Sequence, residues 1–407
     1  MKKQLRVIEL FAGIGSPRKA LIRGGYNFEV VDAIEIDKYA VKSYNAIYNE
    51  NIEAKDICSY NPTKEEIGEI DLLFHGSPCQ DFSLAGKQAG GDKDSGTRSS
   101  LMYETIRIVE ELKPKYVIWE NVKNLLSKKH RHNFDAYLET MKQLGYTNYY
   151  QVLNAKDYGI PQNRERVFTI SILGNENYKF PKGKELDKLP IDLIEENADK
   201  KYDLTEKNIK HYQREFGSKG KELNLYEPIP TLTASMGTGG GNIPYFTFPP
   251  KQPLKLKLKD MLEDEADKKY YLSDKMIKYI SATGTANFKN PDCKINLDIA
   301  RPLTTDQNKR AGTTNYLSDD LPSNYDLSIP IKKDTLKTSP DIEYVTTNLR
   351  IRKLTPKECW RLMGFDDEDF EKASQVNSAT QLYKQAGNSI VVNVIEAIYD
   401  NLLIDYK

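Results

Sequence analysis

Short apolar stretches alternate with longer amphipathic ones over residues 5–173, and this alternation constrains the fold more than any other feature of the chain. The apolar stretches predict strands, which we place at 5–10, 30–36, 71–74, 116–119 and 167–173. The stretches between them predict helices, which we place at 17–23, 39–48, 101–112 and 134–144. Repeated strand–helix units pack as a mostly parallel sheet with helices on both faces. The sequence therefore predicts an α/β domain at the start of the chain.

The composition changes after Gly174. Residues 175–343 are rich in Lys, Asp, Asn, Pro and Thr and show no sustained periodicity, which predicts an irregular, loop-rich second domain. Regular structure returns at Thr355-Pro356-Lys357-Glu358, a capping box that predicts a helix start. A last helix is predicted at 389–403. Its apolar face has to pack on another element, and the first domain is the expected platform.

The bulk composition excludes several classes of protein. The chain has 407 residues, of which 39% are hydrophobic, enough for two or three domains with sizeable cores. It contains no apolar run long enough to cross a bilayer and no signal-peptide core. The four cysteines have neither metal-ligand spacing nor a paired framework, so we expect a cytoplasmic, reduced protein without a metal. A net charge of zero neither supports nor excludes a nucleic-acid partner, because binding needs a local basic face.

A short apolar run at 70–74 is followed by Gly-Ser-Pro-Cys-Gln-Asp-Phe-Ser at 76–83. A buried strand is therefore expected to end just before Cys79, and the proline restricts the backbone beside the cysteine. In open α/β sheets, ligands bind at the carboxyl ends of the strands. Cys79 is accordingly a candidate nucleophile in a glycine-rich loop that continues to about Ser100. Taken alone, a free thiol without a role is the alternative interpretation.

The segment Phe11-Ala12-Gly13-Ile14-Gly15 follows the first predicted strand and opens the first predicted helix. Glycines at such a turn let a ligand approach the backbone, although a purely structural turn has the same pattern. Arg18 stands where the dinucleotide fingerprint has its third glycine, which argues against a pyrophosphate cofactor. Glu35 ends the second strand, where a carboxylate can hold ribose hydroxyls, and Asp56 can cap a turn or accept from an adenine amino group. Jointly these residues describe a nucleoside site without phosphate recognition.

Charged residues also end later strands. Glu120, in Trp-Glu-Asn-Val, is expected along the same sheet edge as Cys79, either as a solvated strand end or as an acid with a raised pKa. Arg164 and Arg166 would share one face of a strand because side chains alternate. That face could hold a carboxylate, a phosphate or a base carbonyl, or it could be an ordinary charged edge strand.

Taken in order, these segments resemble the motifs of the C5-cytosine-specific DNA methyltransferase family of bacterial or phage type. The matching segments are Phe-Ala-Gly-Ile-Gly at 11–15, Glu35, Gly-Ser-Pro-Cys-Gln at 76–80, Glu-Asn-Val at 120–122, Gln-Asn-Arg-Glu-Arg at 162–166 and Gln-Ala-Gly-Asn-Ser-Ile-Val-Val at 385–392. The resemblance covers residues 5–173 and about 349–403. The stretch between them lies where the family carries its target-recognition domain.

The resemblance implies a Rossmann-like class I methyltransferase sheet in a discontinuous domain. The implied parts are a catalytic domain at 1–174, a smaller irregular target-recognition domain at 175–345, and a return segment at 346–407 that completes the catalytic domain. The motif at 385–392 should then pack beside the first glycine loop. The implied cofactor is S-adenosyl-L-methionine, converted to S-adenosyl-L-homocysteine, with no metal. The implied cofactor-binding residues are Phe11, Gly13, Gly15, Glu35, Ile36, Asp56, Ile57, Pro78, Leu101, Asn388 and Ser389.

The resemblance also implies catalytic roles. Attack of the Cys79 thiolate on C6 of cytosine would break aromaticity and make C5 enamine-like. Protonated Glu120 would hydrogen-bond or protonate N3 of the base. Arg164 would hold O2 of the base, and Arg166 would help orient the catalytic groups. The target base has to leave the duplex stack before it can react.

Double-stranded DNA is the partner that the resemblance implies, bound by a monomer that does not associate with membranes. The predicted DNA-binding loop residues are Gln80, Ser83, Gly86, Lys87, Gln88 and Arg98. In the middle domain, the glycine-rich patch at 237–242 is the candidate for close approach to DNA, with a merely flexible loop as the alternative. The enzyme could serve a restriction–modification system with a separate endonuclease, or be an orphan or phage methylase.

Two other functions fit parts of the chain. The first is a tRNA cytosine-5 methyltransferase on the same fold, a branch that resembles a compact enzyme, so the long insert here favours DNA. The second is a non-catalytic DNA-binding homologue. Such proteins lose the cysteine or the Glu-Asn-Val motif, and this chain keeps both.

Overall fold

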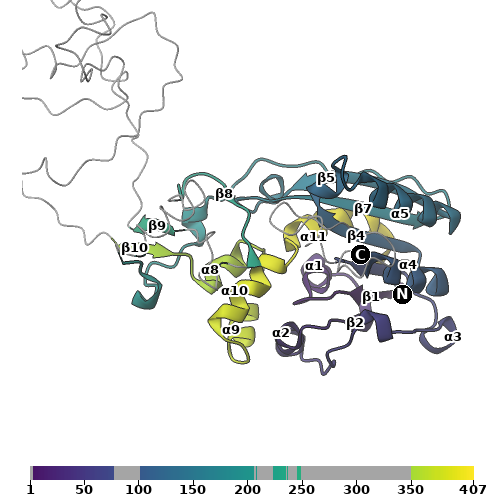
Figure 1. Ribbon diagram of the computed structural model, residues 1–407, viewed down its shortest axis with the longest axis horizontal. Coiled ribbons are helices and arrows are strands. Elements are labelled where there is room, and N and C mark those ends of the chain that lie inside the picture. Colours follow the sequence, from purple (N-terminus) through teal and green to yellow (C-terminus); the bar gives the residue numbers. More distant parts are fainter. Residues whose placement is uncertain are drawn as a thin grey trace, which may run out of the picture. The chain divides into compact units, whose positions relative to one another are not determined.

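The computed structural model of the chain describes residues 3–77, 101–205, 208, 223–234, 236, 245–248 and 350–407. These residues all belong to one compact unit that draws on both ends of the chain, Met1–Lys251 and Thr347–Lys407. Figure 1 shows the C-terminal helices, in yellow, beside the N-terminal strands and helices, in purple.

A six-stranded sheet forms the centre of the unit, in the order β2-β1-β3-β4-β7-β5. Its strands are β1 (Leu5–Leu10), β2 (Phe28–Ile34), β3 (Leu72–His75), β4 (Tyr116–Val122), β5 (Tyr146–Asn154) and β7 (Glu165–Leu173). The first four run parallel to one another, whereas β7 runs antiparallel to both of its neighbours (Figure 1). The predicted α/β fold with a mostly parallel sheet is therefore confirmed.

Helices cover both faces of this sheet because alternate strand residues are buried on opposite sides. The helices are α1 (Ser16–Gly24), α2 (Lys38–Tyr48), α3 (Lys64–Ile67), α4 (Met102–Leu112), α5 (Arg131–Gln143), α8 (Pro356–Arg361), α9 (Asp367–Ser374), α10 (Ala379–Asn388) and α11 (Val392–Leu402). Leu73 belongs to a core cluster with α4 and α5, and its neighbours Leu72 and Phe74 belong to a second cluster with α1 and α11.

Two sequence predictions need correction. The prediction contains no strand at Tyr146–Asn154, yet β5 pairs with β7 along its whole length. Its middle is polar and exposed or half-buried, so it has no apolar run, and its pairing with β7 decides its conformation. The predicted helix at 389–403 is also wrong at its start. The structure ends α10 at Asn388 and begins α11 at Val392.

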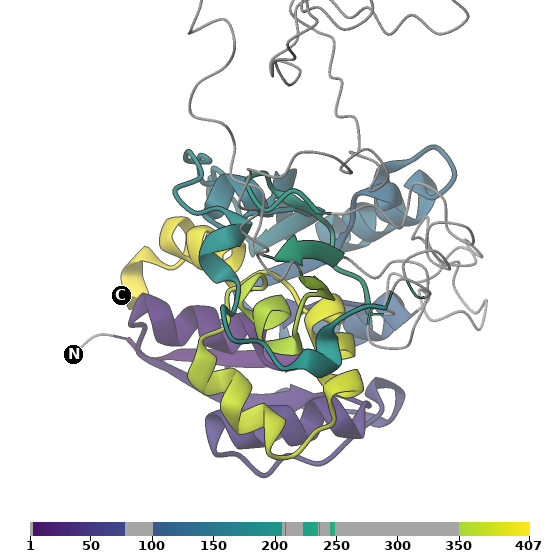
Figure 2. The ribbon, with the colours of Figure 1, turned by 90° about the vertical axis from the view of Figure 1, so that its left-hand side faces the viewer.

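The C-terminal segment packs against the N-terminal part of the chain. Ser16 Oγ lies 2.8 Å from Ser389 Oγ, a pair that is 373 residues apart in sequence. Lys384 Nζ lies 2.7 Å from Asp37 Oδ2, which joins α10 to the start of α2. Figure 2 shows the yellow-green C-terminal helices lying over the purple N-terminal elements. One compact unit is thus assembled from segments separated by nearly the whole chain.

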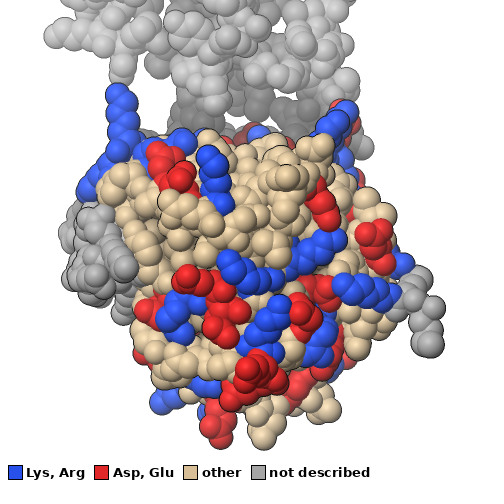
Figure 3. Space-filling model, turned by 90° about the vertical axis from the view of Figure 1, so that its right-hand side faces the viewer, with Lys and Arg blue, Asp and Glu red and all other residues tan. Residues whose placement is uncertain are grey.

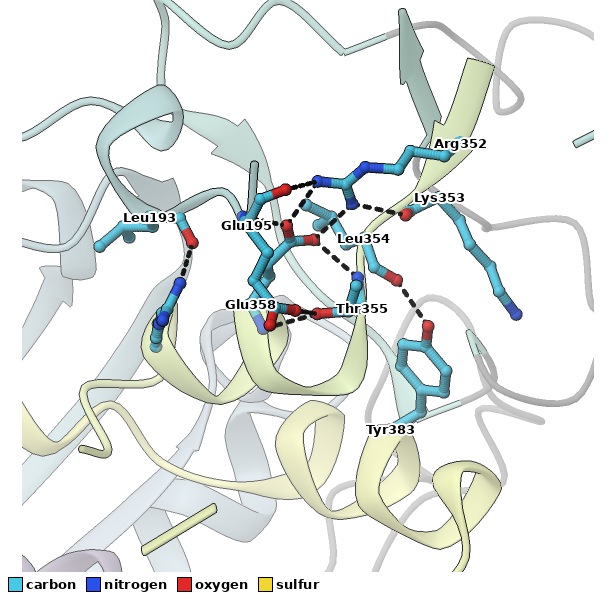
Figure 4. Close-up of polar contacts among 9 residues, drawn as sticks. Leu193, Glu195, Arg352, Lys353, Leu354, Thr355, Glu358 and Tyr383 are labelled. Atoms are coloured by element: carbon cyan, nitrogen blue, oxygen red, sulfur yellow. Dashed lines mark hydrogen bonds and ion pairs between the residues drawn. The ribbon is translucent and has the colours of Figure 1, made fainter. Parts of the chain in front are cut away.

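A buried ion pair lies near a short antiparallel ribbon formed by β9 (Tyr245–Phe248) and β10 (Arg350–Lys353). Arg352 donates to both carboxylate oxygens of Glu358, at 2.8 and 3.0 Å, and to the carbonyl of Glu195, at 2.8 Å (Figure 4). Thr355 caps α8 in the predicted capping box, because its hydroxyl accepts the Glu358 N–H and Glu358 accepts the Thr355 N–H. This cluster ties the ribbon to α8 and to the segment around Glu195. We call it the Arg352 clamp.

The described surface carries mixed charge. On the face in Figure 3, lysine and arginine side chains lie close to aspartate and glutamate side chains, in keeping with the balanced composition. None of the helices in the described ranges is both long enough and apolar enough to cross a membrane.

Candidate active site

The described candidate residues of the N-terminal part gather at the carboxyl edge of the parallel strands. The glycine loop follows β1, Glu35 follows β2, Gly76 and Ser77 follow β3, and Glu120 lies near the end of β4. Parallel strands end at the same edge of a sheet, so segments far apart in sequence converge there. A Cβ added at Gly76 would lie 3.9 Å from Glu120 Oε2 and 3.3 Å from Ile390 Cδ1. The ends of β3 and β4 and the 385–392 motif therefore meet.

The glycine loop has an unusual backbone. Phe11 has a φ of 55°, a left-handed conformation that side chains rarely adopt, and Gly13 follows with a φ of 57°. Strained residues of this kind concentrate at ligand sites. The space around Gly13 is open, since the nearest atom to an added Cβ would be 4.0 Å away. At Gly15 an added Cβ would lie 2.4 Å from the ring of Tyr48, so this glycine is explained by packing.

Glu35 is held by the main chain around it. Its two carboxylate oxygens accept the N–H groups of Gly13 and Asp37, each at 2.8 Å. Desolvation raises the pKa of Glu35, and these backbone hydrogen bonds act in the opposite direction. The next residue, Ile36, is 64% exposed, which is high for a large apolar side chain. A fixed carboxylate and an uncovered apolar group at a strand end suit a ribose and the face of a base.

The remaining predicted cofactor residues are arranged as follows. Asp56 is exposed and caps a short 3-10 helix (Ile57–Ser59), with its carboxylate accepting the Cys58 N–H at 3.0 Å. Ile57 is buried beneath it. Leu101 precedes α4 and is half-buried. Asn388 ends α10 with an exposed side chain, whereas Ser389 is buried against Ser16. The Lys55 N–H donates to the Glu35 carbonyl at 2.8 Å, so the Asp56 turn lies beside Glu35.

Among the predicted catalytic residues that the structure describes, Glu120 has a pKa that its surroundings shift. Its carboxylate is buried, and Arg166 Nε lies 3.0 Å from Glu120 Oε1 across the β4–β7 pair. Desolvation raises the pKa of Glu120, although the charges of Arg166 and Arg164 oppose the shift. Burial thus favours the protonated form of Glu120, and a protonated acid at a sheet edge can donate to a ligand.

The two arginines differ in their surroundings. Arg164 is buried, and its guanidinium donates to three main-chain carbonyls, those of Leu232, Gly387 and Ser389, at 3.1, 3.2 and 2.7 Å. Its terminal nitrogens thus tie the end of β6 (Gln162–Asn163) to two other segments, one at Leu232 and one at 387–389. Arg166, in contrast, is directed at Glu120. This arrangement favours Arg166, more than Arg164, as the group that would meet a substrate beside Glu120.

Several polar residues of the site were not assigned from the sequence. Gln162 is buried, donates to the Leu362 carbonyl at 2.9 Å and accepts the Leu232 N–H at 3.1 Å. Asp37 caps α2 beside Glu35 and pairs with Lys384. The only signal for Asp37 is its position before a helical stretch, a pattern typical of an N-cap. For Gln162 there is no signal beyond its place in the motif, because its partners lie 70 and 200 residues away.

The remaining predictions lie outside the described residues. These are the loop residues Pro78, Cys79, Gln80, Ser83, Gly86, Lys87, Gln88 and Arg98, and the glycine-rich patch at 237–242. Within the described ranges, no group of three or more His, Cys, Asp or Glu side chains could hold a metal ion.

An open, mostly parallel sheet with a hydrogen-bonded carboxylate and a buried acid at its carboxyl edge is the arrangement of an α/β enzyme whose ligands bind at the strand ends. The chain belongs to the family described as C-5 cytosine-specific DNA methylase, whose sequence model matches residues 5–403. It is therefore a DNA (cytosine-5-)-methyltransferase by family.

Relatives of known activity match the chain over nearly its whole length. It is 33% identical to the type II methyltransferase M2.ScrFI of Lactococcus lactis subsp. cremoris, over 98% of this chain and 99% of that protein. It is 32% identical to the orphan methyltransferase M.SPRI of Bacillus phage SPR, over 99% and 98%. Among solved structures, the Entamoeba histolytica methyltransferase EhMeth matches the fold with a TM-score of 0.64, 18% identity and full coverage of both chains.

Proposed function

We propose that this enzyme transfers a methyl group from S-adenosyl-L-methionine to C5 of a cytosine flipped out of double-stranded DNA, with Cys79 as the nucleophile. The observation that carries the proposal is Glu120, a buried acid with a raised pKa beside the end of the strand that leads to Cys79. The chemistry needs a proton donor to the base next to a thiolate. Desolvation favours the protonated form of a carboxyl group, which is the form that can act as this donor.

The cofactor site would lie along the ends of β1 and β2. Glu35 would hold the ribose hydroxyls, and the open space at Gly13 would admit the cofactor to the backbone. Exposed Ile36 would lie against the adenine. Bound S-adenosyl-L-methionine supplies a methyl group on a positively charged sulfur. The other residues that we assign to this site are Phe11, Gly15, Asp56, Ile57, Pro78, Leu101, Asn388 and Ser389.

The reaction would proceed through a covalent adduct. The Cys79 thiolate adds to C6, while Glu120 protonates or hydrogen-bonds N3 and so accepts the electron density displaced from the ring. C5 then has enamine character and would form the new carbon–carbon bond with the methyl group as the sulfur–methyl bond of the cofactor breaks, which leaves S-adenosyl-L-homocysteine. Loss of the C5 proton to a base expels the thiolate and restores the aromatic ring. No residue is assigned to that last base.

Arg166 and Arg164 would then have different roles. Arg166 lies beside Glu120 and would hold O2 of the base while keeping the acid oriented. Arg164 would act as a positioning residue, because its guanidinium joins the carbonyls of Leu232, Gly387 and Ser389. This assignment exchanges the roles that the family resemblance implies for the two arginines.

The test of the chemistry uses duplex DNA in which the target cytosine carries fluorine at C5. Removal of a proton from C5 is then impossible, so the adduct should accumulate as a stable protein–DNA complex in the presence of the cofactor. We expect this complex with the wild-type protein and none with Cys79→Ser. Methyl transfer by the Cys79→Ser protein would contradict the mechanism, and transfer to tRNA in preference to duplex DNA would contradict the substrate.

The region 175–345 would read the DNA sequence, with the loop residues Gln80, Ser83, Gly86, Lys87, Gln88 and Arg98 contacting DNA near the flipped base. The protein would act as a monomer, with or without a separate restriction endonuclease. Bisulfite sequencing of DNA from cells that express the protein would identify the methylated sequence. Protection of scattered cytosines without a common sequence would contradict a specific recognition domain.

A further inference from the structure

Strand β3 ends at His75, four residues before the predicted nucleophile, Cys79. The β3–β4 ladder pairs Leu72 to Tyr116 and continues to a last pair, His75 with Trp119. Gly76 and Ser77 extend beyond this ladder, toward position 79. The strand β4 continues further, through Glu120 to Val122, because it also pairs with β7. The stretch that leads to Cys79 is thus joined to β4 by side chains beyond the ladder.

Two side chains of β4 make that connection. The Trp119 indole N–H donates to Ser77 Oγ at 2.9 Å, and the Asn121 amide donates to the Ser77 carbonyl at 3.4 Å. All three residues are buried, with Ser77 only 4% exposed. A buried hydrogen bond of this kind is costly to break, because the orphaned N–H has no water to replace its partner. The bond therefore sets the distance between the end of β4 and the residues before Cys79.

An aromatic stack fixes the Trp119 ring. His75 lies parallel to it, with ring centroids 5.6 Å apart and an interplanar angle of 8°. Tyr137 of α5 also packs against the Trp119 ring, with the two centroids 4.4 Å apart. Burial lowers the pKa of His75 to about 3, so this ring is neutral and adds no charge. A side chain held this firmly can position another group through one hydrogen bond.

The bond lies on the opposite face of the sheet from the proposed acid. Trp119 packs in the core cluster that includes α4 and α5, and its neighbour Glu120 points to the other side, near Ile390. The Trp119–Ser77 pair is therefore not expected to contact the base. A substitution in this pair removes none of the groups that are proposed to contact Glu120.

We propose that the hydrogen bond from Trp119 to Ser77 is a positioning device for catalysis. It sets the spacing between Glu120, one residue after Trp119, and Cys79, two residues after Ser77. The inference rests on the proposed roles of these two residues. Ser77 and Trp119 are positioning residues, and the side chain at position 77 becomes a determinant of the rate of methyl transfer. Misplacement of reacting groups by about 1 Å is enough to slow a reaction substantially.

A double-mutant cycle tests this coupling. Ser77→Ala removes the acceptor, and Trp119→Phe keeps an aromatic ring but removes the donor. We expect each variant to lower kcat roughly tenfold, with the KM for DNA and for the cofactor within about twofold of wild type. The kcat of the double variant should also be roughly tenfold below wild type, because both substitutions break the same hydrogen bond. Independent effects would instead multiply to a loss of about a hundredfold.

Trp360→Phe is the matched control. Trp360 is fully buried, and its indole N–H also donates one hydrogen bond, to the Leu382 carbonyl at 3.0 Å, in α8 away from the β3–β4 end. We expect a similar loss of stability with unchanged kcat at a temperature where all variants are folded. Unchanged kcat in Ser77→Ala, or multiplicative losses in the double variant, would overturn the coupling. Neither result would touch the proposed chemistry, which fails separately if Cys79→Ser retains methyl transfer.

Discussion

Two arginine–glutamate pairs with a buried carboxylate differ in how many hydrogen bonds that carboxylate accepts from the described residues. In the Arg352 clamp, Glu358 receives two nitrogens of Arg352 and the N–H groups of Thr355 and Glu195, all within 3.0 Å (Figure 4). At the sheet edge, Glu120 meets Arg166 through Nε at 3.0 Å, and burial raises its pKa. One carboxylate is surrounded by four hydrogen-bond donors. The other is desolvated, which favours its protonated form.

The difference shows how the same two residue types serve structure or chemistry. A buried charge is tolerated when hydrogen bonds replace its hydration, and the four donors around Glu358 do this. Among the described residues, Glu120 has one ion-pair partner, Arg166, and burial raises its pKa, so the charged form is disfavoured relative to a solvated glutamate. Incomplete compensation costs stability, and such costs concentrate at functional sites. The clamp joins the β9–β10 ribbon to α8, whereas Glu120 lies at the carboxyl edge of the central sheet.

The largest effect should come from Glu120→Gln. The amide keeps the size of the side chain but cannot transfer a proton to N3, so we expect kcat to fall roughly 10²–10⁴-fold. The free energy of unfolding should stay the same or rise slightly, because a desolvated acid has been removed. Single-turnover methylation and urea unfolding measure the two quantities. A large loss of stability with little loss of rate would place Glu120 with Glu358 as a structural residue.

The reverse result is expected for Glu358→Gln. The Arg352 guanidinium would remain buried without its counter-charge, so the free energy of unfolding should fall by roughly 3–5 kcal/mol. Cofactor affinity at low temperature should be retained, since the clamp is far in sequence and structure from the glycine loop. Urea unfolding and equilibrium binding of the cofactor check both points. Replacement of both partners by Met provides the control, and should restore much of the lost stability.

A third buried carboxylate lies between these extremes. Glu9 accepts from the Arg18 N–H at 2.8 Å and the Tyr44 hydroxyl at 2.7 Å, and burial raises its pKa to about 7. Folded Glu9 keeps its proton up to about pH 7, whereas the unfolded chain releases it near its usual pKa of 4.5. The folded state therefore binds more protons between these values, and stability should fall as pH rises through that window, by roughly 3 kcal/mol at most.

Urea midpoints at pH 5 and pH 7.5 measure this effect. Other acids also titrate in the window, so the informative quantity is the difference between the wild type and Glu9→Gln. The amide variant should show the shallower fall. Identical pH dependence in the two proteins would mean that Glu9 is ionised in the folded state. Its charged form would then be stabilised by more than its two hydrogen bonds.

The smallest effect is expected for Asp367→Asn. Arg361 holds both carboxylate oxygens of Asp367 at 2.7 Å and lowers its pKa to about 2, a geometry as good as that of the clamp. The side chain of Asp367 is 43% exposed, however, so water screens the pair. We expect a loss below about 1 kcal/mol, measured by urea unfolding. A loss as large as that of Glu358→Gln would show that geometry, and not burial, decides these pairs.

Much of the fold could be predicted from local pattern. The parallel strands and their helices follow from apolar periodicity, and the capping box at Thr355 formed as expected. Local pattern failed at β5, where polar residues occupy a strand that only its pairing with β7 stabilises. It also failed at Ser389–Val391, which separates α10 from α11, because the buried contact of Ser389 with Ser16 involves the other end of the chain.

The sequence by itself determined which residues stand at strand ends, and it identified the family through the order of its motifs. Only the tertiary structure decided which hydrogen-bond and ion-pair partners each charged group has. Arg164 and Arg166 look equivalent in Gln-Asn-Arg-Glu-Arg, yet one holds three carbonyls and the other faces Glu120. Ser77 gains its partner Trp119 from 42 residues away. Periodicity and capping are local and can be read along the chain, whereas desolvation and hydrogen bonding depend on neighbours that folding brings together.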